Sequence, residues 1–355
     1  MLCISCSVEK GGEGMQSIHF FAGSNTARGF YSCFENILPA DMRRRMFFIK
    51  GGPGVGKSTL MRRVGAYAEE KGLKAIYFHC SSDPDSLDGV CLPERGIGLM
   101  DATAPHVYDP VIPGARDTLL SLGDHLDEKA LAPHAGEIID IQQRISARFA
   151  RCYRYLAAAE QVFLSSPPGM MDESKAAQLA DDWARTLPLR GGTGRIVRLF
   201  ASAFTPKGFL NLTDFSQMER RITLEVPFGT HATGLMQLIA HRAAARGLDV
   251  VELCDPLSPA ETAHVLIPAH GVAFCTAQRA PEGGEFLEAD AAFRLIAGSE
   301  HEQSFDRNAY ELLCQRAIEQ LMGAKALHDE LEKCYVRNMD FAAWEKKLAQ
   351  VLDII

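Results

Sequence analysis

Long apolar runs are missing from this sequence of 355 residues, so it predicts no membrane-spanning helix and no membrane partner. Cysteine is sparse, with 10 residues, and the 30 glycines show no three-residue period, which excludes a disulfide scaffold and a collagen-like chain. Positively charged residues are fewer than negatively charged ones. The 37 Lys and Arg against 45 Asp and Glu give a net charge of −8, which argues against a surface that binds nucleic acids in general. What is present is 47% hydrophobic and 23% charged, as in globular proteins, and at roughly 150 residues per domain the length predicts about two domains.

The first residues do not resemble a targeting signal. Residues 1–10 lack the basic start and the apolar stretch of a secretory signal peptide. Only Cys3 and Cys6 have the spacing of metal ligands, and no second pair completes a zinc site. Most other cysteines lie in apolar stretches, where a free thiol packs as a small hydrophobic group. We therefore expect a cytoplasmic protein whose residues 1–16 form a disordered tail.

The sequence repeats itself once. The segment FAGSNTARGF, which begins at Phe21, recurs as FASAFTPKGF from Phe200. Further identities keep a fixed offset of 175 positions, as between Gly54 and Gly229 (229 minus 54), and the offset holds as far as Gly96. Because one register is kept over so long a stretch, we interpret the chain as a tandem duplication of one unit.

Both units predict the same order of elements. An opening strand leads through a glycine-containing turn and a short helix to a second strand, a loop and a helix. A third strand, another loop, a fourth strand and two helices complete the unit, and Asp172 and Asp340 are placed to cap the second of those helices. Strands that alternate with helices predict an α/β fold with parallel sheets. In the first unit the strands are expected at 18–22, 46–50, 75–79 and 96–100.

A glycine-rich motif, GGPGVGKS, occupies residues 51–58 and fits the Walker A or P-loop pattern GxxxxGK[ST] in full. An apolar strand precedes it and a helical pattern follows it. Glycine lets the backbone wrap phosphates with its N–H groups pointing inward, and the helix N-terminus adds a positive dipole. Lys57 is predicted to reach the terminal phosphates and Ser58 to ligate Mg²⁺. The predicted nucleotide-binding residues are Gly51, Gly52, Pro53, Gly54, Val55, Gly56, Lys57, Ser58 and Thr59.

With this motif the fold prediction becomes specific. We expect two tandem P-loop NTPase-like domains, each with a C-terminal helical hairpin. The first domain is predicted at residues 17–190 and the second at 191–355, joined through the glycine-rich stretch 190–194. Only the first is expected to be active.

An apolar strand at 96–100 ends in Asp101. In P-loop proteins a carboxylate at this place, beside the loop, holds Mg²⁺. Asp101 is therefore predicted to ligate Mg²⁺ together with Ser58 and, with Lys57, to belong to the catalytic residues. The alternative is that Asp101 only caps the turn that follows it.

Three aspartates follow the third strand, at the sheet edge where open α/β folds bind ligands. Asp83 lies nearest to the strand, ahead of Asp85 and Asp88, and is predicted to be the catalytic carboxylate that orients the attacking group. The alternative is a turn in which Asp and Ser side chains hydrogen-bond to their own backbone.

The second unit lacks the groups expected to touch phosphate. At the offset of 175, Lys57 becomes Ala232, and the loop 226–231 replaces small glycines with larger residues. Phe228 adds apolar bulk where phosphate would lie. We therefore expect a degenerate domain whose loop packs against protein, and one nucleotide per chain.

The nucleotide is expected to be ATP, because the Asn-Lys-x-Asp motif of GTPases is missing and so is the ABC-transporter signature. The entry to the P-loop, TARGF at 26–30, resembles that of RecA-like ATPases, whereas the helical tail also resembles nucleotide kinases. The leading prediction is a Mg²⁺-dependent ATPase. Two alternatives stay open: a phosphotransferase acting on a nucleotide or another small molecule, and an ATP-gated interaction module with negligible turnover. The protein or small-molecule partner is unknown.

The segments FAGSNTARGFYS, IKGGPGVGKSTLM, HCSSDPDSLDG, LMDATAPH and LFASAFTPKGF together resemble an uncharacterised bacterial family of double P-loop ATPase-like proteins. The resemblance covers nearly the whole chain from about residue 17 and implies a cytoplasmic ATP-binding protein. In that family the second half can carry its own GxxxxGK[ST], so its loss here is a departure. The departure weighs against a mechanism that needs two active sites.

Overall fold

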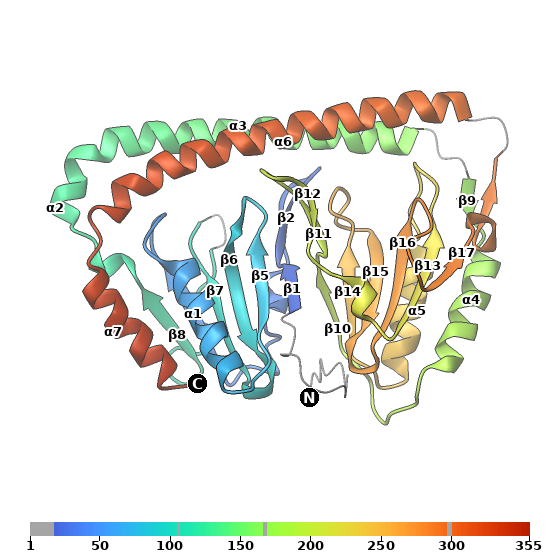
Figure 1. Ribbon diagram of the computed structural model, residues 1–355, viewed down its shortest axis with the longest axis horizontal. Coiled ribbons are helices and arrows are strands. Elements are labelled where there is room, and N and C mark those ends of the chain that lie inside the picture. The colour runs from blue at the N-terminus through green and yellow to red at the C-terminus, as the bar shows by residue number, and fades with distance from the viewer. Residues whose placement is uncertain (1–17, 105–106, 166–168, 297–299) are drawn as a thin grey trace.

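The computed structural model describes residues 18–104, 107–165, 169–296 and 300–355. The predicted tail, residues 1–16, lies outside these ranges. Two six-stranded sheets stand side by side, and two long helices run antiparallel across the top of both (Figure 1). None of the described helices is both long enough and apolar enough to cross a membrane. The fold is α/β, as predicted.

The first sheet is mixed rather than parallel. Strand β6 lies antiparallel to both of its neighbours, β5 and β7, while the other pairs are parallel. The prediction of a loop after the third strand is therefore wrong, because residues 83–92 form the strand β6. Asp, Pro and Gly are depleted in strands, and Ser is common in turns, which is why this composition indicated a turn. In spatial order the strands are β1 (Ile18–Phe21), β5 (Ile76–Cys80), β6 (Asp83–Leu92), β7 (Ile97–Asp101), β4 (Arg45–Lys50) and β8 (Asp117–Ser121).

The second sheet has the same arrangement of strands. Its antiparallel member is β15, between β14 and β16, and the remaining pairs are parallel. The order of the strands thus agrees with the sequence repeat. In space the strands are β10 (Ile196–Leu199), β14 (Val250–Cys254), β15 (Thr262–Ile267), β16 (Val272–Ala277), β13 (Arg220–Glu225) and β17 (Glu285–Leu287).

Each sheet carries a small hairpin directly after its first strand. The sequence predicted a glycine-containing turn there, and Gly29 and Gly208 do turn the chain with φ of +95° and +107°, a region that glycine adopts without strain. The short helix that follows is a single 3-10 turn in each half. The short strands are β2 (Gly23–Thr26), β3 (Gly29–Ser32), β11 (Ser202–Thr205) and β12 (Gly208–Asn211), with a separate pair β9 (Gly169–Met171) and β18 (Phe293–Leu295).

The helices divide into sheet-covering helices and the long pair. Asp172 and Asp340 cap α4 and α7 as predicted, because each side chain accepts hydrogen bonds from the second and third backbone N–H groups after it. The helices are α1 (Lys57–Glu70), α2 (Glu128–Leu131), α3 (Ala135–Ser165), α4 (Glu173–Thr186), α5 (Thr233–Ala245), α6 (Glu300–Val336) and α7 (Phe341–Leu352). Single 3-10 turns lie at Phe34–Asn36, Pro93–Arg95, Gly123–His125, Ala132–His134, Phe215–Gln217, Pro268–His270 and Ala289–Ala291.

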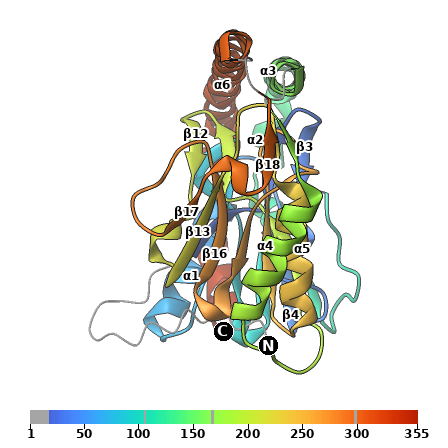
Figure 2. The same cartoon turned by 90° about the vertical axis from the view of Figure 1, so that its right-hand side faces the viewer.

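The two halves exchange their last helices. α3 leaves the first half and crosses to the second, where α4 packs beside α5 against the second sheet (Figures 1 and 2). There Trp183 stacks on Phe274 with ring centroids 5.2 Å apart. α6 crosses back, and α7 packs against the first half, where Trp344 and Leu348 are buried beside α1. The sequence predicted a hairpin in each half, and the structure shows that the second helix of each hairpin covers the other half.

The sheets also share one core. Phe20 and Phe78 of the first sheet lie in the same buried cluster as Leu199 and Val251 of the second. The edge strands β1 and β10 face each other at this junction. Helices and sheets therefore both join the halves, and the carboxyl ends of the parallel strands in each sheet point toward α3 and α6.

Candidate functional site

The glycine-rich loop lies where the sequence predicted it, between the end of β4 and the start of α1. Gly54 and Gly56 have φ of +70° and +88°, which side chains other than glycine rarely adopt. The N-terminus of α1 begins at Lys57, directly after the loop. The loop conformation therefore depends on glycine at both positions.

A cavity of about 460 Å³ opens above this loop, between the edge of the first sheet and the long helices. Residues 53–59 and the strand-end carboxylates Asp83 and Asp101 line its floor, whereas α3 and α6 form its roof. Gly51 and Gly52, also predicted to bind nucleotide, precede the lining. The structure thus brings most of the predicted site residues together around one cavity.

Lys57 occupies the centre of the site. Its Nζ donates hydrogen bonds to the carbonyl oxygens of Gly51, at 2.7 Å, and Gly52, at 2.9 Å. The same atom lies 3.5 Å from Oδ2 of Asp101, and both side chains are largely buried, at 13% and 16% exposed. The ammonium is therefore held by two carbonyl oxygens of its own loop and faces a carboxylate on the neighbouring strand.

Asp101 lies beside the loop because β7 is the direct parallel neighbour of β4, with Asp101 in register with Ile49. Its Oδ1 accepts a hydrogen bond from the N–H of Thr103 at 2.9 Å, while Oδ2 faces Lys57. Asp101 thus caps a turn with one oxygen, as in the alternative interpretation, while its other oxygen faces Lys57 in the cavity. Ser58, the second predicted Mg²⁺ ligand, accepts a hydrogen bond from the N–H of Leu87 at 2.9 Å.

Asp83 is in the site but already has partners. It begins β6 and lines the cavity. Its Oδ2 accepts a hydrogen bond from the hydroxyl of Ser86 at 2.8 Å and lies 3.6 Å from Nζ of Lys325 on α6. Asp85, in contrast, is exposed and pairs with Lys207 of the second half at 2.6 Å.

Asp88, which the sequence placed behind Asp83 as a catalytic candidate, is the more buried of the two carboxylates. It is only 4% exposed, lines the cavity, and its Oδ2 has no hydrogen-bond partner among the described residues. Burial raises the pKa of Asp88 to about 8, and the nearby charge of Asp101 adds to the shift. A signal was present in the sequence: only Gly89 separates Asp88 from the apolar segment 90–92, which is typical of a strand rather than a turn.

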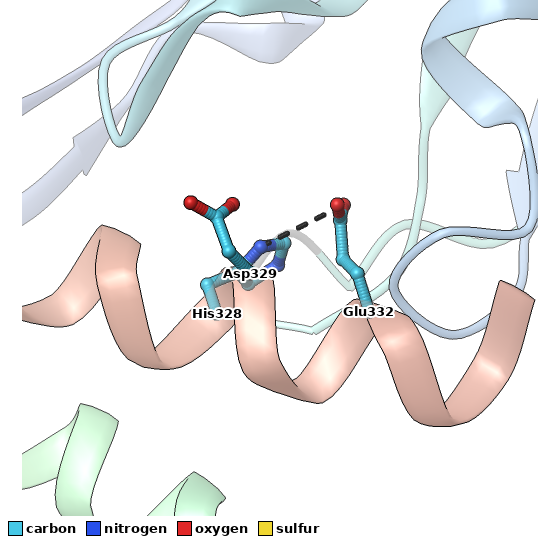
Figure 3. A group of neighbouring side chains, drawn as sticks. All are labelled: His328, Asp329 and Glu332. Atoms are coloured by element: carbon cyan, nitrogen blue, oxygen red, sulfur yellow. Dashed lines mark ion pairs between the residues drawn. The ribbon is translucent and has the colours of Figure 1, made fainter.

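A second group of possible metal ligands lies on the roof. The ligand atoms of His328, Asp329 and Glu332 are all within 4.8 Å of one another, and Nδ1 of His328 is 3.7 Å from Oε1 of Glu332 (Figure 3). Burial lowers the pKa of His328, which favours the neutral imidazole. Lys325, however, forms an ion pair with Asp329 and so neutralises part of the negative charge of this group.

The second half supplies the wall behind the glycine-rich loop. A Cβ added to Gly54 would lie 2.7 Å from the side chain of Val336, and one added to Gly56 would lie 2.8 Å from Nε1 of Trp344. Both positions therefore require glycine for a second reason besides φ, because a Cβ atom would clash with a side chain of the second half. This contact could not be predicted from the sequence, because Val336 and Trp344 lie more than 280 residues after the loop (336 minus 54 is 282).

The corresponding loop of the second half packs against protein, as predicted. Phe228 makes edge-to-face contacts with Phe163 of α3, at 5.1 Å, and with Tyr310 of α6, at 5.4 Å. Ala232, at the place of Lys57, is 3% exposed. A cavity of about 420 Å³ lies over this sheet too, and no lysine is among the described residues that line it. The chemistry of the first site is therefore not repeated.

Comparisons of the chain with protein-family models, with curated proteins and with solved structures find no match. The interpretation of the site accordingly depends on its own geometry.

Proposed function

We propose that this chain binds Mg²⁺-ATP in the cavity of the first half and hydrolyses it. The observation that carries the proposal is the position of Lys57. It begins a helix after a glycine-rich loop and faces Asp101 on the neighbouring parallel strand, inside a cavity of about 460 Å³. That set of a helix N-terminus, a lysine and a strand-end carboxylate is the arrangement that binds polyphosphate in P-loop proteins.

The phosphates would lie in the loop. Backbone N–H groups and the positive end of the α1 dipole favour anions there. On binding, Nζ of Lys57 would exchange the carbonyl oxygens of Gly51 and Gly52 for phosphate oxygens. Because the ammonium is already positioned, this exchange needs no large rearrangement.

The carboxylates fit a magnesium ion. Ser58 and Asp101 offer oxygen ligands on the cavity floor, beside the glycine-rich loop. Oxygen ligands of this kind are those that Mg²⁺ prefers. When bound, Mg²⁺ would neutralise charge on the β- and γ-phosphates. Without it, so many carboxylates would repel a nucleotide.

Two carboxylates of β6 could orient the attacking water. Asp83 is held by Ser86 and Lys325, whereas Oδ2 of Asp88 has no hydrogen-bond partner in the described part of the chain. The raised pKa of Asp88 suits proton transfer near neutral pH. The arrangement therefore favours Asp88 as the proton acceptor and leaves Asp83, the residue predicted from sequence, to position Lys325.

A nucleotide-gated interaction module is the second candidate. The observation that favours it is the contact of Val336 and Trp344 with the glycine-rich loop, since both belong to helices of the second half. A ligand that moves the loop would press on these helices. Binding could then alter the second half whether or not the nucleotide is hydrolysed.

The test is ADP production from Mg²⁺-ATP by wild type, Lys57→Ala and a matched control, Lys50→Ala. Lys50 ends β4, pairs with Asp109 and does not line the cavity. Hydrolysis is expected in wild type and Lys50→Ala and to be lost in Lys57→Ala. ADP that appears only when an acceptor nucleotide is added would instead indicate a kinase. Tight binding without ADP would indicate the module, and turnover unchanged in Lys57→Ala would contradict the proposed site.

A further inference from the structure

The cavity of the first half receives a lysine from the second half. Lys325 lies on α6, which begins above the second sheet and ends above the first (Figure 1). Its side chain is 26% exposed and lines the same cavity as Lys57 and Asp101. The first half by itself, up to residue 190, does not contain this cation.

The ammonium of Lys325 is held by carboxylates on both sides. Its Nζ lies 3.6 Å from Oδ2 of Asp83 on β6 and forms an ion pair with Asp329, one turn further along α6. A lysine ammonium is a compact charge on a flexible four-carbon stem. It can therefore exchange a carboxylate for a phosphate oxygen while the helix backbone stays in place.

The backbone that carries Lys325 is well anchored. Leu327 and Leu331 are 8% and 2% exposed and pack against Ile138 and Ile141 of α3. At its C-terminal end the same helix contacts the glycine-rich loop through Val336. The position of Lys325 over the cavity is thus fixed relative to the loop that would hold the phosphates.

We infer that Lys325 is a positively charged group supplied by the second half to the terminal phosphate of the nucleotide, an inference that rests on the proposed function. In hydrolysis the water oxygen bonds to the γ-phosphorus, and the bond from that phosphorus to the bridging oxygen breaks. ADP leaves with the electron pair, and the water proton passes to Asp88 in its ionised, carboxylate form. Charge grows on the γ-phosphate oxygens and the bridging oxygen, where a roof cation can stabilise it.

In this role the second half takes part in nucleotide hydrolysis, although its own loop has lost the residues expected to bind phosphate. Without α6, the site would keep Lys57 below the phosphates but have no lysine above them. In P-loop GTPases, a second cation at the terminal phosphate raises the rate by about 10³- to 10⁵-fold.

The experiment compares wild type with Lys325→Ala, Lys325→Arg and a matched control, Lys207→Ala, in the full-length chain. Lys207 is also a second-half lysine paired with a β6 aspartate, Asp85, but it does not line the cavity. Turnover and the dissociation constants of Mg²⁺-ATP and Mg²⁺-ADP are measured for each. For Lys325→Ala we expect a loss of about 100-fold in turnover. ATP affinity should fall by about tenfold relative to ADP affinity, since only ATP carries the γ-phosphate.

Lys325→Arg should keep most of the ATP preference, and Lys207→Ala should match wild type. The double variant Asp83→Asn/Lys325→Ala removes both charges of the pair. It should remain defective, because the missing contact is to phosphate; recovery would show that Lys325 only neutralises Asp83 and would overturn the inference. An unchanged ATP preference in Lys325→Ala would overturn it as well. Failure of wild type to bind any nucleotide would instead refute the proposed function itself.

Discussion

Phe21 and Phe200 occupy equivalent positions in the two copies of the repeat, and their backbones are hydrogen-bonded to each other. The N–H of each donates to the carbonyl oxygen of the other, at 2.9 and 3.0 Å. A pair that is equivalent in sequence and reciprocal in contact lies where a two-fold axis would pass. The halves are thus arranged like the subunits of a symmetric dimer, with the exchanged helices α4 and α7 completing each other's cores.

This arrangement predicts how the halves behave when they are separated. Residues 1–190 would expose Trp183 on α4, and residues 191–355 would expose Trp344 on α7, because each is buried only against the other half. We expect each fragment alone to aggregate, whereas the two produced together should form a one-to-one complex. Size-exclusion chromatography with light scattering checks this. A soluble, monomeric first fragment that binds ATP would contradict the account.

Much of the fold and of the site could be predicted from the sequence, because the signals for both are local. The glycine-rich loop and the caps Asp172 and Asp340 each depend on a few neighbouring residues. The exchange of helices could not be predicted in this way, since an apolar helix face does not specify which surface will cover it. β6 was missed for another reason: the residues that suit it to a polar cavity, among them Asp83 and Asp88, are those that usually indicate a turn.

Asp88→Asn should separate stability from activity. Burial raises the pKa of Asp88 to about 8, so at neutral pH folding must protonate this carboxyl group, whereas an amide of the same shape does not titrate. We expect the free energy of unfolding to rise by about 1 kcal/mol while turnover falls at least tenfold. Urea denaturation and ADP release measure the two quantities. Asp290→Asn, at an exposed aspartate of the second half, serves as the control, and a less stable Asp88→Asn protein would refute the argument.

Trp344 should report nucleotide binding by fluorescence. The chain has two tryptophans, so Trp183→Phe leaves Trp344 as the single emitter beside Gly56. Adding Mg²⁺-ATP to that variant should change its emission, and the change should vanish when Lys57→Ala is added. The reciprocal variant, Trp344→Phe, keeps only Trp183 in the second half and should show no change. An equal response from both tryptophans would mean that the ligand does not act at the loop.

His264 should make the protein less stable in acid. Its Nδ1 accepts a hydrogen bond from the N–H of Thr276 at 3.1 Å, and burial lowers its pKa to about 4. Because the unfolded chain takes up this proton near pH 6.5, the stability contributed by the neutral ring is complete above that pH. It is lost as the pH falls toward 4, by at most about 1.4 kcal/mol per pH unit.

Unfolding midpoints measured between pH 7 and 4.5 test this effect. His264→Gln keeps an acceptor for the N–H of Thr276 but cannot be protonated, so its stability should decline less steeply than that of wild type. His241→Gln, at an exposed histidine of α5, should follow the wild-type slope. Parallel curves for wild type and His264→Gln would show that this histidine does not control the acid response.

Calorimetric titration with Mg²⁺-ATP tests the central claim most directly, because it counts the sites. If the first half holds the nucleotide and Phe228 and Ala232 have closed the second loop to phosphate, wild type should bind one nucleotide per chain and Lys57→Ala none. Two nucleotides per chain, or one that Lys57→Ala still binds with wild-type affinity, would contradict the account.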